Sequence, residues 1–98
     1  MEKVLEQYLK KAIELNSDYI EVEYKDYHEE IIAVQGSLGL GIGRIKSSSS
    51  KGKKLLTQLH EIVRKKIEIN LDGHNYEISA KSYDSFGEAA FKVKISLK

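Results

Sequence analysis

The feature that most constrains the fold is a hydrophobic periodicity that changes along the chain. From Glu2 to about Leu15, and again around Leu55 to Val63, apolar residues recur three and four positions apart. This spacing predicts two amphipathic helices, the second of about fifteen residues. Elsewhere apolar residues follow the shorter spacing of half-buried strands. The strands predicted in this way cover residues 20–25, 30–35, 38–45, 67–71, 76–80 and 91–97.

The resulting order is helix, three strands, helix, three strands. Each clear strand is apolar on one face only, which is typical of an antiparallel sheet with one covered side. Two amphipathic helices are about what one such face needs. We therefore expect a single α+β domain over residues 1–98, a two-layer sandwich of αβββαβββ order whose sheet is mainly antiparallel and whose helices share one face. The repeated αβββ order is compatible with an internal duplication, but a single repeat of this kind also arises by chance.

Turn-forming residues separate these elements. Tight turns are expected at residues 26–28, 35–37 and 72–73, where Asp and Gly tolerate the required backbone angles. Residues 47–50 are four serines that predict a polar linker, and residues 83–87 predict a longer loop. Glycines alternate at positions 39, 41 and 43, which indicates a bulge or another surface packed close to that strand.

The composition excludes several classes of protein. The chain has no cysteine, so it has no disulfide scaffold, thiolate metal site or cysteine nucleophile. Sixteen basic and 15 acidic side chains give a net charge of +1, which argues against a strongly polyanion-seeking protein and against an acidic disordered tail. Charged residues occur in every turn of the first helix, unlike a signal peptide or a transmembrane segment. We expect a cytoplasmic protein with no transmembrane segment.

The motifs of common enzymes are not found. Gly52 and Lys53 are followed by Lys54 instead of Ser or Thr, and position 47 is not Gly, so the Walker loop fails. The zinc motif His-Glu-x-x-His and the Gly-x-Ser-x-Gly elbow are also missing. No pair of carboxylates stands out as an acid and a base. The sequence therefore predicts no enzyme activity, no catalytic residue, no cofactor and no metal site.

The sharpest polar feature is the basic segment, which we define as residues 44–54. It lies in the part of the chain from 36 to 66, which holds eight basic residues and one acidic residue. Cations ahead of a helix start can collect phosphate groups, whereas a hydrated loop explains the same charges without a ligand. No aromatic residue is interleaved in the sequence, which disfavours base stacking. The candidate contacts for an anion or a nucleic acid are Arg44, Lys46, Lys51, Lys53 and Lys54.

The uncovered face of the sheet is expected to be polar. Opposite charges on neighbouring strands stabilise such a face by some tenths of a kcal/mol per pair, about 0.2–1 in general, without any ligand. Its expected residues are Glu21, Glu23, Glu68, Asn70, Glu77, Ser79, Lys92 and Lys94.

Several short motifs resemble one family. Residues 12–24, which include Ser17 and Asp18, resemble the opening of the domain that precedes the motor in the ATPases of type II secretion and type IV pilus assembly. Residues 34–38 and 67–78 are similar to that domain's two hairpins, and Gly87 with Glu88 matches its Gly-Glu before a strand of alternating apolar residues. The resemblance spans nearly the whole chain, with the elements in order.

The departures limit what the resemblance implies. Glu21 stands where the family has His, and residues 79–86 lack the arginines that in the family face nucleotide bound by the motor. The motor domain and its phosphate loop are missing, so ATP hydrolysis does not follow. The resemblance implies a non-catalytic protein-interaction or regulatory module whose partner is another protein, such as a motor or a membrane-associated assembly. The alternative is an anion or nucleic-acid binding domain that uses the basic segment.

Overall fold

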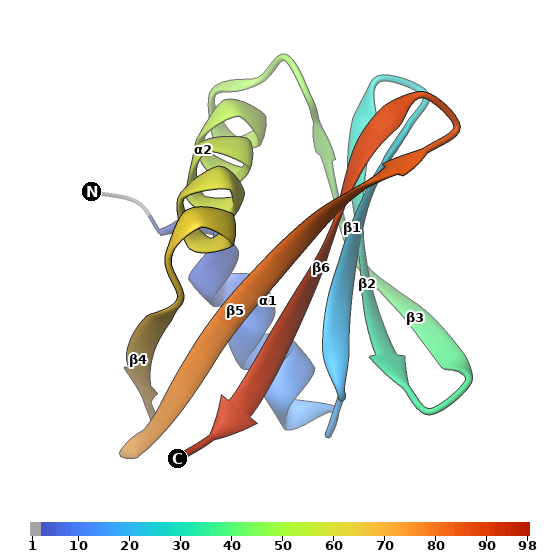
Figure 1. Ribbon diagram of the computed structural model, residues 1–98. Coiled ribbons are helices and arrows are strands. Elements are labelled where there is room, and N and C mark those ends of the chain that lie inside the picture. The colour runs from blue at the N-terminus through green and yellow to red at the C-terminus, as the bar shows by residue number, and fades with distance from the viewer. Residues whose placement is uncertain (1–2) are drawn as a thin grey trace.

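A computed structural model describes residues 3–98 as two helices and one six-stranded antiparallel sheet (Figure 1). The predicted α+β class and antiparallel pairing are confirmed. The start of the first helix at Glu2 lies outside the described residues. The elements in chain order are α1 (Val4–Glu14), β1 (Tyr19–Lys25), β2 (His28–Gln35), β3 (Leu38–Lys46), α2 (Ser50–Arg64), β4 (Ile67–Leu71), β5 (His74–Ser85) and β6 (Glu88–Leu97).

The sheet joins two three-stranded meanders at its centre. Its order is β3-β2-β1-β6-β5-β4, so β3 and β4 are the edge strands. The two meanders meet where β1 pairs with β6, with Tyr19 opposite Lys94 and Ile20 opposite Val93. The central ladder therefore connects residues from opposite parts of the chain.

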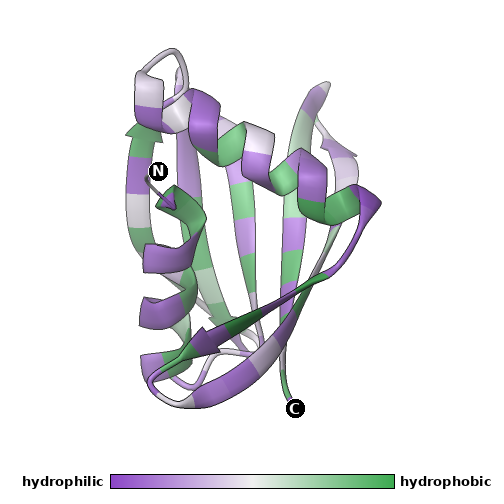
Figure 2. Cartoon of the chain, turned by 90° about the vertical axis from the view of Figure 1, so that its left-hand side faces the viewer, coloured by the Kyte–Doolittle hydropathy of each residue, from purple (hydrophilic) through white to green (hydrophobic). Residues whose placement is uncertain are grey.

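Both helices cover the same side of the sheet (Figures 1 and 2). Helix α1 packs on β1 and β3, while α2 packs on β3 and β5. The alternate apolar residues of the strands point toward the helices, and the colouring in Figure 2 shows the resulting alternation along the strands. The core includes Leu9, Ala12, Ile20, Val22, Ile31, Leu55, Leu59, Ile78, Phe91 and Val93.

The two αβββ halves have opposite hands. Each half can be viewed from the helix side and turned so that its first strand, β1 or β4, points upward. In this view β2 lies on one side of β1, whereas β5 lies on the other side of β4. This difference follows from the strand order and from the antiparallel direction of every pair. The halves do not superimpose as repeated units, although they share one element order.

Three hairpins close through two residues with positive φ. These residues are Asp26 with Tyr27, Asp72 with Gly73, and Phe86 with Gly87. The expected loop over residues 83–87 is wrong, because β5 continues to Ser85 and only Phe86 and Gly87 lie between the strands. Phe86 has a positive φ, a backbone conformation that bulky residues rarely adopt.

The alternating glycines of β3 predict a bulge or a closely packed surface, and the structure has both. The register with β2 shifts between Ile31 and Ile32, which forms a bulge. A Cβ atom on Gly43 would lie 2.3 Å from Cε1 of Tyr8, so the ring of an α1 residue occupies the space that a side chain would need. This close approach fixes α1 against β3.

Candidate functional site

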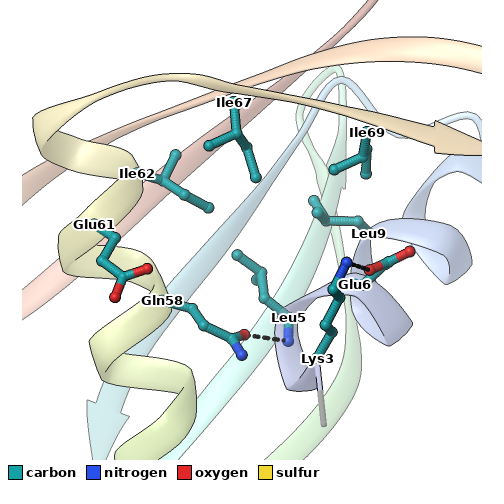
Figure 3. A pocket seen from close by; sticks show the side chains of 9 residues that line it. All are labelled: Lys3, Leu5, Glu6, Leu9, Gln58, Glu61, Ile62, Ile67 and Ile69. Atoms are coloured by element: carbon teal, nitrogen blue, oxygen red, sulfur yellow. Dashed lines mark hydrogen bonds and ion pairs between the residues drawn. The ribbon is translucent and has the colours of Figure 1, made fainter. Parts of the chain in front are cut away.

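An apolar groove lies between α1, α2 and β4 (Figure 3). The groove is lined by apolar side chains from all three elements: Leu5 and Leu9 of α1, Ile62 of α2, and Ile67 and Ile69 of β4. Its remaining lining residues are Lys3, Glu6, Gln58 and Glu61. An apolar floor therefore meets a polar rim in one hollow.

A hydrogen bond joins the two helices beside the groove (Figure 3). Leu5 lies in the first turn of α1, where backbone N–H groups have no partner within the helix. Its N–H donates to Oε1 of Gln58 at 2.9 Å, so a side chain of α2 satisfies the start of α1. Leu5 and Leu9 lie one turn apart and form one side of the floor.

The size and chemistry of the groove suit an apolar side chain. Its volume is about 230 Å³, which lies between the ~150 Å³ of a cavity that admits benzene and the roughly 300 Å³ or more of drug-sized ligand sites. Ile67 is 40% exposed at its mouth. Nζ of Lys3 lies 3.9 Å from the Glu6 carboxylate on the rim. The groove can hold one branched or aromatic group.

The basic segment is divided between two elements. Arg44 and Lys46 lie on β3, on the side of the strand away from the buried Ile45. Lys51, Lys53 and Lys54 lie in the first turns of α2, which packs on the helix side of the sheet. Nε of Arg44 is 3.9 Å from the Glu30 carboxylate in an exposed ion pair.

The linker before α2 is anchored by specific hydrogen bonds. Ser49 caps the helix, because its Oγ accepts from the N–H of Gly52 at 3.0 Å and donates to the carbonyl of Lys46 at 2.6 Å. The hydroxyl of Ser47 donates to the carboxylate of Glu29, whose side chain is buried. The start of α2 is therefore held against the β2–β3 hairpin.

The fold also brings an aromatic residue to the basic segment. The N–H of Ser47 donates to the carbonyl of Tyr27 at 2.9 Å, so the first hairpin turn lies beside the linker. The side chain of Tyr27 is 75% exposed. No aromatic residue is interleaved with these cations in the sequence, but the fold brings Tyr27 of a separate turn next to Ser47.

The open face of the sheet carries an acidic patch. Glu23 stands opposite Glu30 in the β1–β2 ladder, and Glu21 lies two residues away on the same face. Burial, followed by the charge of Glu21, raises the pKa of the Glu23 carboxyl. Burial, together with the charges of Glu21 and Glu23, raises the pKa of the neighbouring Tyr83 hydroxyl.

A basic patch lies beside it. Lys81 stands opposite Lys92 in the β5–β6 ladder, and with Lys94 and Ser79 they line a second hollow of about 240 Å³. Nζ of Lys92 lies 4.1 Å from the centroid of the Tyr19 ring. Glu21 faces Lys92, which is a cross-strand pair of the expected kind. Glu23 with Glu30 and Lys81 with Lys92 are instead pairs of like charge.

Neither the groove nor the position of Tyr27 could be predicted from the sequence. The sequence pattern identifies Leu5, Leu9 and Ile62 only as core residues. Periodicity predicts which face of a helix is buried but not how far apart two helices lie. Among residues 3–98, no three His, Asp or Glu side chains are grouped so that they could hold a metal ion. No helix in the same range is long and apolar enough to cross a membrane.

No model of a known protein family matches the chain, and no curated protein sequence is similar to it.

Proposed function

We propose that the chain is a non-catalytic protein-interaction or regulatory module that binds one apolar side chain of a partner protein in its groove. In this proposal it is a two-layer αβββαβββ sandwich that resembles the pre-motor domain of secretion ATPases, and it acts in the cytoplasm. The observation that carries the proposal is the apolar floor formed by Leu5, Leu9 and Ile62 below the half-exposed Ile67.

The groove has the anatomy of a protein-binding site. Protein interfaces concentrate their binding energy in a few large side chains that fill desolvated pockets, surrounded by a polar rim. The groove offers such a pocket for one side chain, and the ion pair of Lys3 with Glu6 borders it. It is too small to enclose a nucleotide or another cofactor of that size.

A display selection tests the proposal. Random twelve-residue peptides are selected on the folded protein, and enriched peptides are measured by fluorescence anisotropy and mapped by amide chemical shifts. We expect the enriched peptides to share one large apolar residue and to shift Leu5, Leu9 and Ile69. Because it places a charge at the mouth of the groove, Ile67→Asp should weaken binding by about tenfold or more.

The matched control adds the same charge elsewhere. Phe86→Asp changes an exposed apolar residue of the β5–β6 turn and should leave peptide affinity unchanged. Peptides that bind equally well to Ile67→Asp, or whose shifts map outside the groove, would contradict the proposal.

The second candidate function is binding of an anion or a nucleic acid by the basic segment. It is favoured by the hydrogen bond from the Ser47 N–H to the Tyr27 carbonyl, which brings the turn that carries the exposed Tyr27 next to the linker before α2. Such a combination of cations with a ring is what binding of single strands requires. The five candidate cations divide between β3 and α2, and Arg44 already pairs with Glu30.

An amide chemical-shift titration with a short single-stranded oligonucleotide separates the two functions. Binding by this route should shift residues 27 and 44–54, weaken steeply as salt rises, and disappear when Lys51, Lys53 and Lys54 are changed together to Gln. Tyr27→Asn, which suits the positive φ of the turn, should remove only the stacking part. If binding survives the triple change, the basic segment is not the site.

A further inference from the structure

Strand β3 leaves an open edge that carries no charge over most of its length. Residues 36–43 contain only Gly, Ser, Leu and Ile, followed by Arg44 and Lys46. The other edge strand, β4, has five residues and is flanked by ion pairs of Lys66 with Glu77 and Glu68 with Lys98. Proteins usually protect exposed edges by short length and by charge. Strand β4 has this protection, whereas residues 36–43 do not.

The backbone groups available at this edge follow from the hydrogen bonds of β2. The carbonyl of Val34 accepts from the N–H of Asp18 at 2.7 Å, so it points away from β3. Gly39, which stands opposite Val34, therefore directs its own N–H and C=O away from β2, toward the open side. Gly41 lies two residues on and does the same. These two glycines can therefore pair with a further strand at the uncharged part of the edge.

The side chains beside these glycines are apolar and exposed. Leu38 is 74% exposed and Leu40 is 56% exposed. Both lie on the side of the sheet that carries the helices, because Leu40 stands opposite the buried Ala33. A Cβ atom on Gly41 would have no neighbour within 4 Å, so the open face of the sheet is uncovered at this position.

We propose that β3 pairs antiparallel with β3 of a second copy of this chain, about a two-fold axis that passes through Leu40. In this register Gly39 pairs with Gly41 of the second copy, and Gly41 with its Gly39, which gives about four hydrogen bonds. Leu40 faces its own counterpart as a non-hydrogen-bonded pair, in which side chains are closest. The product is a continuous twelve-stranded sheet.

The charge pattern selects this occupant and this direction. An antiparallel arrangement places Arg44 of each copy opposite Gly36 of the other, so the cations of the two copies lie at opposite ends of the ladder. A parallel arrangement would place them side by side. The surface is also self-complementary, because the leucines of one copy cover those of the other on one face.

The bulge keeps the ladder short. The register shift at Ile31 and Ile32 bends β3 beyond Gly41, so each copy pairs over only a few residues. We therefore expect a dimer in the weak range of about 10 µM to 1 mM. Sedimentation equilibrium of the full chain across that range should show a concentration-dependent rise in mass.

Two substitutions test the edge. Leu40→Lys places two like charges opposite each other on the axis and should weaken the dimer by about tenfold or more. Ile67→Lys makes the same kind of change on the β4 edge and should leave the dimer intact. Both variants are checked for folding by circular dichroism. A protein that stays monomeric up to about 1 mM, or a dimer that only Ile67→Lys disrupts, would overturn the proposal.

Single cysteines test the register without relying on a disruptive change. The chain has no cysteine, so each variant has one thiol. Cysteines at position 40 of the two copies would have Cα atoms about 4.5 Å apart, within the range of a disulfide. Cysteines at position 38 would lie about four residues, or 13 Å, apart. Leu40→Cys should therefore cross-link several times faster than the more exposed Leu38→Cys, and equal or reversed rates would overturn the proposed axis.

Discussion

Replacing Gly52 with Ala should destabilise the protein, although the change would stabilise most helices. Gly52 is the third residue of α2, and Ala is favoured over Gly inside a helix by about 1 kcal/mol. Here a Cβ atom would lie 2.3 Å from the carbonyl oxygen of Lys46 and 2.8 Å from that of Ser47. Both are backbone atoms, so no side-chain rotation removes the conflict.

The expected size follows from three contributions. Overpacking of this kind costs about 1–3 kcal/mol. The forced shift also disturbs the bond from the Gly52 N–H to Ser49, and loss of such a cap costs about 1 kcal/mol. After subtracting the helix preference of Ala, we expect a net loss of about 2 kcal/mol, or roughly 8–16 °C in Tm for a domain of this size.

Urea unfolding followed by circular dichroism measures this loss. Lys53→Ala, at the next and exposed position, is the matched control and should change the free energy of unfolding by less than about 0.5 kcal/mol. Ser49→Ala measures the cap alone. If Gly52→Ala is as stable as the natural chain or more stable, the contact with the Lys46 carbonyl does not control this position.

Three further substitutions follow from the structure. Gly43→Ala should lower the free energy of unfolding in urea by about 1–3 kcal/mol, because its Cβ would lie 2.3 Å from Tyr8. The double variant Gly43→Ala with Tyr8→Ala should lose less stability than the sum of the losses of the two single variants, and simple additivity would count against the contact. Burial and the charge of Glu21 raise the pKa of Glu23 above its ordinary 4.5, so the folded state holds a proton that the unfolded state has lost, and stability falls as pH rises through that window. Glu23→Gln should therefore unfold at higher urea than the natural chain at pH 7 and lose this advantage below about pH 4; a constant difference across pH would contradict the assignment. Phe86→Asn should raise Tm by a few degrees, because Asn suits the positive φ of the turn and the ring is fully exposed; a lower Tm would mean that the ring contributes to stability.

Periodicity predicted the elements well because burial on one face controls it. The alternation of Phe91 and Val93 and the helical spacing of Leu55 and Leu59 each reflect a side chain that is fully buried in the fold. The prediction failed at residues 83–87, where Tyr83, Ser85 and Phe86 gave no alternating apolar signal. There the hydrogen bonds of a long hairpin, not burial, keep the chain extended.

Proximity in the sequence also failed to predict which residues are neighbours in the fold. Residues 47–50 predicted a polar linker, but Ser50 begins α2 and Ser49 caps that helix by accepting from the Gly52 N–H. Tyr27 is 20 positions from Ser47 and lies beside it through one backbone hydrogen bond. The basic segment is continuous in the sequence but divided in the fold. The direction of the Arg44 side chain is set by the alternation of strand β3, whereas Lys51 lies in the first turn of α2.

The central ladder sets an order of events during synthesis. It joins Tyr19 to Lys94, about 75 positions apart, and closing a loop of that length costs about 4 kcal/mol in chain entropy. A ribosome completes α1 and the first meander long before it reaches β6. Until residues 91–94 are made, β1 is an edge strand like β3, and the nascent sheet has two open sides. The interval between making β1 and making β6 is therefore when this chain most needs protection from its neighbours on the polysome.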